Sequence, residues 1–227
     1  IIITLCKLRR IKMDMKGSIA AIKDAITKST AERTSPEVIS AAYAVVYLIG
    51  GVLLASARLL GAAGPFGMAA VAASGAGLNG VAALIGAAIG YIISCGLAGS
   101  IRYLAAIVLV YTISFAFQDT KLASKSVFAP ATAAVSALST GILSSFTSVF
   151  TQAPAAAVVL IETVFSFGGC WFFREAMSGR ERTTESEELR YAGSVLITAA
   201  VLLMAVSQIE IFGAISLGRL VAVLIVM

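Results

Sequence analysis

One carboxylate stands inside a long apolar stretch of this sequence. Glu162 lies near the middle of residues 154–173, a run long enough to cross a lipid bilayer. An ionisable side chain at that depth is energetically costly and is a functional candidate by default. It could relay protons or ions, or it could form a structural ion pair or remain a protonated, hydrogen-bonded carboxyl. The structural role is favoured, because no second acid lies at a comparable depth.

Three arginines are the candidate intramembrane partners of Glu162. Arg58 and Arg102 lie near the outer ends of predicted helices, from which long side chains can reach the membrane surface. Arg219 lies deeper in an apolar segment and needs an acidic partner, either Glu210 or Glu162. The sequence does not choose among these partners.

The residue types that are missing exclude several chemistries. The chain has no histidine, which removes histidine general bases, Ser-His-Asp triads and histidine-bound metals. Its three cysteines, Cys6, Cys95 and Cys170, are far apart and are interpreted as small buried apolar residues. No phosphate-binding GxxxxGK loop and no GxSxG nucleophile turn occurs. We therefore expect no catalytic residue, cofactor or metal in this chain, and no nucleic-acid partner.

The composition indicates a membrane protein. Hydrophobic residues make up 59% of the 227 residues and charged residues only 13%, whereas soluble domains have about 45–50% and about 25%. A soluble core could not hide so much apolar surface, because a folded protein must still cover itself with polar groups.

A basic leader precedes the apolar segments. Residues 1–37 hold eight of the 17 Lys and Arg residues against four acids. Ile19, Ile22 and Ile26 recur at helical spacing, which is compatible with an amphipathic helix on an anionic membrane surface. A solvated leader that only sets orientation is an equal alternative. The basic residues expected at the membrane surface are Lys7, Arg9, Arg10, Lys12, Lys16, Lys23 and Lys28.

Residues 38–227 predict an all-α, polytopic transmembrane helix bundle with about seven helices and an incomplete eighth. The predicted segments are residues 38–60, 66–77, 80–96, 101–117, 127–150, 154–173, 191–209 and a last one from 211. The second segment is short and poor in bulky residues, so we expect it to be buried among the others. The chain starts at Ile1 and ends at Met227 inside an apolar run, so we expect a fragment of a longer protein.

The distribution of charge predicts the orientation of this bundle. With a cytoplasmic N-terminus, fourteen of the 17 Lys and Arg residues fall in segments on the cytoplasmic side. Short loops rich in these residues stay inside, so charge and helix number agree. Small residues predict close packing of the third segment, where Ala82, Gly86 and Gly90 form a small-xxx-small face. Such a face more often packs within one chain than between chains.

Several short motifs resemble the membrane domain of the stage II sporulation protein E family, which are bacterial serine phosphatases. They cover most of residues 38–227 in matching order. The motifs are Tyr47-Leu48-Ile49-Gly50 with Arg58, Gly64-Pro65-Phe66-Gly67-Met68-Ala69, Ile161-Glu162-Thr163, Glu187-Glu188-Leu189, Ile211-Phe212-Gly213 and Ile215-Ser216-Leu217-Gly218-Arg219.

The resemblance implies about ten membrane helices followed by a cytoplasmic, manganese-dependent phosphatase domain beyond Met227. It further implies self-association, a place in the bacterial cell membrane at the polar division septum, and contact with the tubulin-like division protein. The implied substrate is an anti-anti-sigma factor, whose dephosphorylation activates the forespore sigma factor. The metal-binding aspartates of that domain would lie outside this chain.

Two other classes of function compete with this interpretation. The first is a small-solute transporter or permease subunit, which would need convergent polar groups near the membrane midplane and broken helices in matching halves. The second is a non-catalytic membrane scaffold, which the scarcity of polar residues in the interior permits. In all three cases the lipid bilayer is the first partner.

Overall fold

The computed structural model describes residues 36–59, 62–146, 153–178, 184–207, 210–211 and 215–216. The predictions for the basic leader and for Arg219 lie outside these residues. The chain divides into two units, Ile1–Tyr43 and Ala44–Met227. The described part of the first unit is the beginning of one helix, and all the packing below belongs to the second unit.

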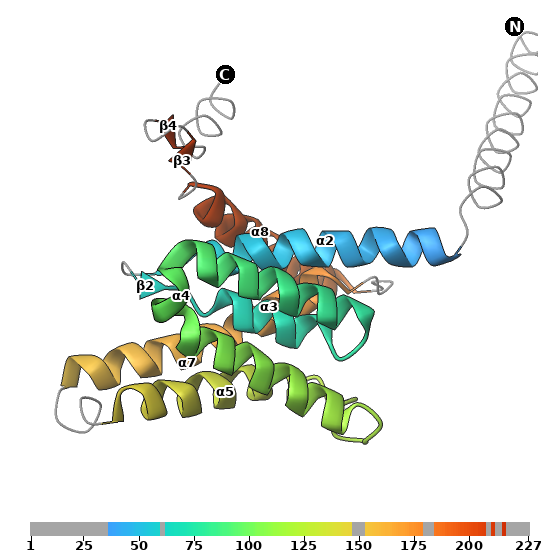
Figure 1. The fold of residues 1–227 in the computed structure, drawn as a ribbon. Coiled ribbons are helices and arrows are strands. Elements are labelled where there is room, and N and C mark those ends of the chain that lie inside the picture. The colour runs from blue at the N-terminus through green and yellow to red at the C-terminus, as the bar shows by residue number, and fades with distance from the viewer. Residues whose placement is uncertain are drawn as a thin grey trace, which may run out of the picture. The chain divides into compact units, whose positions relative to one another are not determined.

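The described residues are almost entirely helical (Figure 1). The helices are α2 (Pro36–Ser56), α3 (Phe66–Ser74), α4 (Leu78–Phe117), α5 (Phe128–Ser144), α7 (Ala153–Ala176) and α8 (Glu185–Ser207). Two antiparallel pairs of two-residue strands complete them: β1 (Arg58–Leu59) with β2 (Ala62–Ala63), and β3 (Glu210–Ile211) with β4 (Ile215–Ser216).

Four of these helices are long and apolar enough to cross a membrane. They are α2 from Val38 onward, α4, α7 from Pro154 onward and α8. Many large apolar side chains on their outer faces are exposed, among them Val46, Ile93 and Val164. Such a surface suits lipid and not water, since a soluble monomer rarely exposes large contiguous apolar patches.

Helix α4 folds back on itself at Gly96. The φ angle of Gly96 is 68°, in the left-handed region that glycine adopts without steric cost. Tyr91 and Tyr103 consequently stack with ring centroids 4.9 Å apart, although a straight helix would separate twelve residues by about 18 Å. The Tyr111 hydroxyl likewise donates to the Ala76 carbonyl at 3.1 Å. Residues 78–95 and 97–117 are therefore two antiparallel helices, as the third and fourth predicted segments require.

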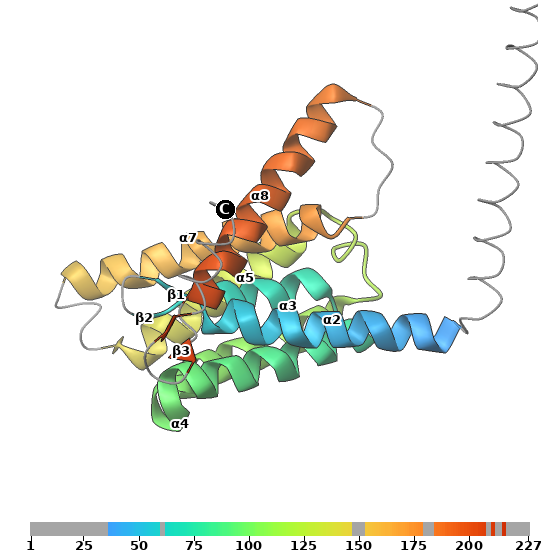
Figure 2. The same cartoon turned by 90° about the horizontal axis from the view of Figure 1, so that it is seen from above.

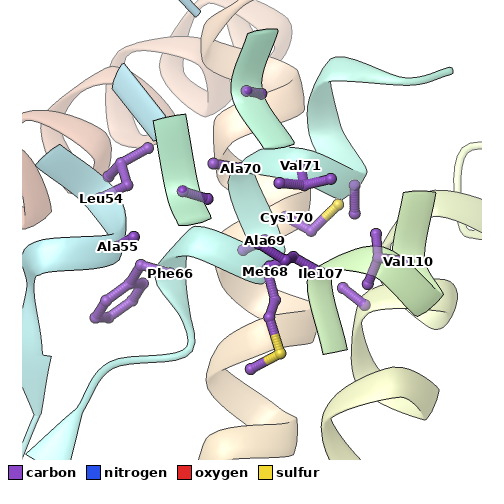
Figure 3. Packing of buried hydrophobic residues seen from close by; sticks show 14 of the residues in the cluster. Leu54, Ala55, Phe66, Met68, Ala69, Ala70, Val71, Ile107, Val110 and Cys170 are labelled. Atoms are coloured by element: carbon purple, nitrogen blue, oxygen red, sulfur yellow. The ribbon is translucent and has the colours of Figure 1, made fainter. Parts of the chain in front are cut away.

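The short helix α3 forms the centre of the second unit. Its residues from Phe66 to Ala72 are all buried, and Figure 3 shows them among side chains of α2, α4 and α7, including Ala55, Ile107 and Cys170. The Phe66 ring contacts those of Phe165 and Phe173 on α7, with centroids 6.1 and 6.4 Å apart. The predicted short, buried second segment is thus present.

The small residues on the first half of α4 face α2. A Cβ atom added to Gly90 would lie 2.5 Å from the Val52 carbonyl oxygen, and one added to Gly86 would collide with the carbonyl of Leu48. Ala82, on the same face, is also buried. Both contacts join residues 38 positions apart, so α2 and this half of α4 run parallel. In the chain, α3 comes after α2 and before α4.

Helices α5 and α7 run antiparallel and side by side, and α8 crosses α7 obliquely (Figure 2). In α8 only Ser194 and Ala205 are buried. It begins at Glu185, earlier than the predicted Tyr191, because Glu185, Glu187 and Glu188 in its first turn complement the helix dipole. Helix α2 ends at Ser56, before the predicted Leu60, since the β1–β2 turn follows it.

One end of the second unit gathers the loops that carry most described positive charge. A pocket of about 210 Å³ lies at this end. It is lined by the turn at Ala76 between α3 and α4, by the loop of residues 118–126, and by Arg174. Arg174 donates to the Ser126 carbonyl at 3.3 Å, and Arg190 lies 3.9 Å from the Glu175 carboxylate. Lys121 and Lys125 belong to the same loop. We call this the basic end.

Candidate functional site

The deep carboxylate of Glu162 forms an ion pair with Arg102. The Arg102 guanidinium on the second half of α4 donates to the carboxylate on α7. The side chain of Glu162 is only 6% exposed and that of Arg102 is 20% exposed. Both charges are thus largely removed from solvent, and a buried ion needs its partner because desolvation costs several kcal/mol per ion.

Two tyrosines extend this pair into a chain of contacts that reaches α3. The Tyr103 hydroxyl donates to the other Glu162 carboxylate oxygen at 3.0 Å, and the Arg102 guanidinium lies 5.3 Å from the Tyr103 ring centroid. Tyr91 stacks on Tyr103. Its hydroxyl donates to the Gly64 carbonyl at 3.1 Å and accepts from the Met68 amide at 3.3 Å.

The Tyr91 contacts explain how non-helical backbone is tolerated at this depth. The described residues between α2 and α3, 57–59 and 62–65, are not helical, and backbone groups inside a membrane must be satisfied by protein. Tyr91 satisfies one carbonyl and one of the first amides of α3, and the Gly64 amide donates to the Ala57 carbonyl at 2.8 Å. The ion pair therefore also supports the start of α3 through the tyrosine stack.

The structure chooses among the three arginines proposed for Glu162. Arg102, one of the three predicted partners, is the residue that pairs with Glu162. The reversal at Gly96 turns the chain back, and the second half of α4 then brings Arg102 to Glu162. Arg58 is exposed and donates to the Ser94 carbonyl near the reversal. Arg219 and the basic residues of the leader lie outside the described residues.

Three buried polar atoms near this pair have no hydrogen-bond partner within the described part of the chain. They are Arg102 Nε and the hydroxyls of Ser136 on α5 and Ser166 on α7. Both serines are 0% exposed. Sequence reasoning missed them, because serine is common in membrane helices and usually bonds its own backbone. The available signal was their spacing: Ser136 follows Thr132 by four residues and Ser166 follows Glu162 by four residues, so each serine shares a helix face with a buried polar residue.

No cluster with the residues of a metal site or a covalent catalyst occurs in the described residues. No group of three or more His, Cys, Asp or Glu could hold an ion there. Cys95 and Cys170 are free thiols, the first partly and the second fully buried. What the site can do chemically is hold one charge pair in a membrane interior and hydrogen-bond small polar molecules.

The helices and this pair define a class: a helical protein with four segments fit to cross a membrane and a charge pair buried between two of them. No family model, no curated protein and no solved structure matches the chain.

Proposed function

We propose that this chain is the membrane-anchoring, localising and self-associating domain of a protein serine phosphatase similar to stage II sporulation protein E. The observation that carries the proposal is that the buried carboxylate of Glu162 is bonded within the protein. Glu162 is bonded to both Arg102 and Tyr103, which makes it a clamp between α4 and α7. A clamp of this kind suits a rigid anchor.

The motif at residues 64–69 supports the resemblance. Gly64 to Met68 are buried, and a Cβ atom added to Gly64 or Gly67 would lie 2.5 Å from the Ala57 carbonyl oxygen or 2.7 Å from the Tyr91 hydroxyl. The residues that carry the resemblance are therefore the ones that form the turn into α3. A turn packed this tightly leaves little freedom in residue type, as expected for a motif that identifies a family.

The basic end is the cytoplasmic end in this proposal. Arg174 lines the pocket there, Lys121 and Lys125 belong to the loop beside it, and Arg190 lies near Glu175. Positive loops are retained inside. This orientation places the end of α7 and the start of α8 in the cytoplasm. It is the same orientation that brings a phosphatase domain to cytoplasmic substrates at the division septum.

The test is the intact mass of the polypeptide extracted from its native membrane, followed by proteolysis from the cytoplasmic side. We expect a mass well above 23.3 kDa and release of a soluble fragment with manganese-dependent phosphatase activity. A native mass of 23.3 kDa, or a released fragment without phosphatase activity, overturns the proposal.

The second candidate is a small-solute transporter or permease subunit. The non-helical entry into α3 and the polar atoms near Glu162 favour it, because transporters bind substrates at interrupted helices near the midplane. Uptake of a solute into vesicles that is lost in Glu162→Gln and retained in Glu175→Gln, a variant at a partly exposed site, would support this function. Retained uptake in Glu162→Gln would count against it.

A further inference from the structure

A second pocket lies at the basic end, where the apolar span of α7 ends at Ala176. Its volume is about 350 Å³, within the range of about 300–1,000 Å³ that is usual for sites that hold small molecules. The end of α7 and the loop before α5 both contribute to it. We call it the α7 pocket, and the residues that line it are Ser124, Ser126, Trp171, Arg174, Glu175 and Ser178. They carry three hydroxyls, two opposite charges and one indole ring.

The two charged side chains of the α7 pocket both have hydrogen-bonding capacity to spare. Within the described residues, Arg174 donates to the Ser126 carbonyl at 3.3 Å, and a guanidinium has five N–H donors. The Glu175 carboxylate lies 3.9 Å from Arg190 Nε, which is too far for a hydrogen bond. A carboxylate accepts up to about four hydrogen bonds. A ligand in the pocket therefore finds donors on Arg174 and acceptors on Glu175.

The charges that line the pocket determine which charges its ligand carries. A purely anionic group bound to Arg174 would meet the Glu175 carboxylate, and a purely cationic group would meet the guanidinium, and like charges brought together are unfavourable. A group that joins a phosphate to an ammonium pairs with both side chains. Trp171 is a further partner, since an ammonium group is attracted to the face of an indole ring. The pocket is therefore complementary to a phosphate joined to an amine.

The face of α7 that leads from the pocket into the apolar span is itself exposed. Leu160, Val164 and Phe167 precede Trp171 at helical spacing on one face, and their side chains are 59%, 68% and 37% exposed. From Leu160 to Trp171 the helix rises about 16 Å, about half of the ~30 Å hydrocarbon core of a bilayer. Tryptophan is enriched where that core meets the headgroups. A polar pocket above an apolar face as long as one leaflet suits a lipid better than a soluble metabolite.

We propose that the α7 pocket binds the headgroup of a phospholipid with a primary amine, such as phosphatidylethanolamine. The phosphate lies on Arg174, the amine on Glu175, and an acyl chain along the exposed face of α7. The N–H groups of a primary amine donate to a carboxylate, whereas the trimethylated amine of phosphatidylcholine has none, and phosphatidylglycerol has no amine for Glu175. This inference is independent of the relationship to a phosphatase, and it gives the membrane domain a preference for one class of lipid.

The test uses Trp171 as the reporter, because it is the one tryptophan of the chain and lines the pocket. The purified chain is reconstituted in phosphatidylcholine vesicles with increasing fractions of a lipid that carries bromine on shallow carbons of its acyl chains, which quenches an indole on contact. The brominated lipid is phosphatidylethanolamine, phosphatidylglycerol or, as the reference, phosphatidylcholine. We expect phosphatidylethanolamine to quench at least ~5-fold more potently than either of the others, because only its amine forms a hydrogen bond with Glu175. Equal quenching by all three lipids, or strongest quenching by phosphatidylglycerol, overturns the proposal.

Substitutions then assign the two halves of the headgroup. Glu175→Gln should abolish the preference for phosphatidylethanolamine over phosphatidylglycerol, and Arg174→Gln should weaken quenching by both lipids. The matched control is Lys125→Gln, which removes one positive charge from an exposed side chain of the neighbouring loop that does not line the pocket. Equal effects of Arg174→Gln and Lys125→Gln would indicate only a diffuse basic surface and refute the site.

A soluble competitor distinguishes a lipid from a free headgroup compound. Glycerophosphoethanolamine added to the vesicles should not relieve quenching by brominated phosphatidylethanolamine, because the acyl chain contributes to binding along α7. Relief of quenching would assign the pocket to a soluble compound and overturn the proposal. The selectivity of the unsubstituted chain is measured without any variant, so a variant that fails to fold does not remove the test.

Discussion

The coupling between Arg102 and Glu162 can be measured with a double-mutant cycle. The variants are Arg102→Met, Glu162→Gln and the combination of both. Arg102→Met leaves Glu162, with a side chain only 6% exposed, without its cation. Glu162→Gln leaves an arginine that is 20% exposed and retains an acceptor for the Tyr103 hydroxyl. Arg102→Met is therefore the more damaging of the two single changes.

The expected magnitudes follow from the burial of each partner. Removing one member of a buried pair costs about 3–5 kcal/mol, and replacing both by uncharged residues is often nearly neutral. We expect a loss of about 3 kcal/mol for Arg102→Met, at the lower limit of that range, and of about 2 kcal/mol for Glu162→Gln, below the range because the remaining arginine is partly exposed. The double variant should lose only about 1 kcal/mol, which gives a coupling energy of several kcal/mol.

The assay is unfolding by sodium dodecyl sulfate in mixed micelles, followed through the fluorescence of Trp171. Trp171 is the one tryptophan of the chain and lies on α7 with Glu162. The control cycle uses Arg190→Met and Glu175→Gln, a pair 3.9 Å apart whose side chains are 60% and 30% exposed, for which we expect a coupling below about 0.5 kcal/mol. If the Arg102–Glu162 coupling is equally small, the reasoning about a buried clamp is refuted.

Three further predictions concern the backbone around this clamp. Gly86→Ala should destabilise the protein by about 1–3 kcal/mol through overpacking against Leu48, whereas Gly168→Ala, which meets nothing within 4 Å, should have no destabilising effect in the same unfolding assay. Gly96→Ala should cost about 1–2 kcal/mol because the φ angle of 68° suits glycine, and an unchanged unfolding midpoint would contradict the reversal described for α4. Tyr91→Phe should cost about 1–3 kcal/mol, since the Gly64 carbonyl loses its donor and the Met68 amide its acceptor. Hydrogen exchange of the Met68 amide should accelerate in Tyr91→Phe and stay unchanged in the control Tyr43→Phe.

Hydropathy and turn residues predicted the helices because apolar run lengths carry that information directly. Pro36 and Pro154 mark helix starts, and Gly75 and Gly96 mark where the chain turns. The boundary between the third and fourth segments was predictable for this reason, and the non-helical backbone angles of Gly96 place the reversal there. The loop predicted at 174–190 overlaps both neighbouring helices, since α7 extends to Ala176 and α8 begins at Glu185, where acidic residues suit a first helical turn.

The partner of Glu162 could not be predicted from the sequence. Arg58 and Arg102 both lie near ends of predicted helices and Arg219 lies deeper, so each could reach Glu162 in the sequence pattern. Only the fold, which brings Arg102 on α4 to Glu162 on α7, identifies the partner. The same holds for Ser136 and Ser166, whose burial depends on which faces of α5 and α7 meet. Tyr91 and Tyr103 lie twelve residues apart and gave no pattern, because the reversal that stacks them is a property of one glycine.

The burial of α3 has a consequence for how the protein is made. With nine residues, α3 is far below the ~20 residues that a membrane segment needs to be inserted on its own. Its anchor contacts through Phe66 are to Phe165 and Phe173, about a hundred residues later in the chain, which a ribosome adds in about 5–20 s. We therefore expect α3 to enter the bilayer late, after its downstream neighbours. During that interval the nascent chain exposes the turn at residues 57–65 to whatever insertion factor is present, so assembly and not only final stability constrains this segment.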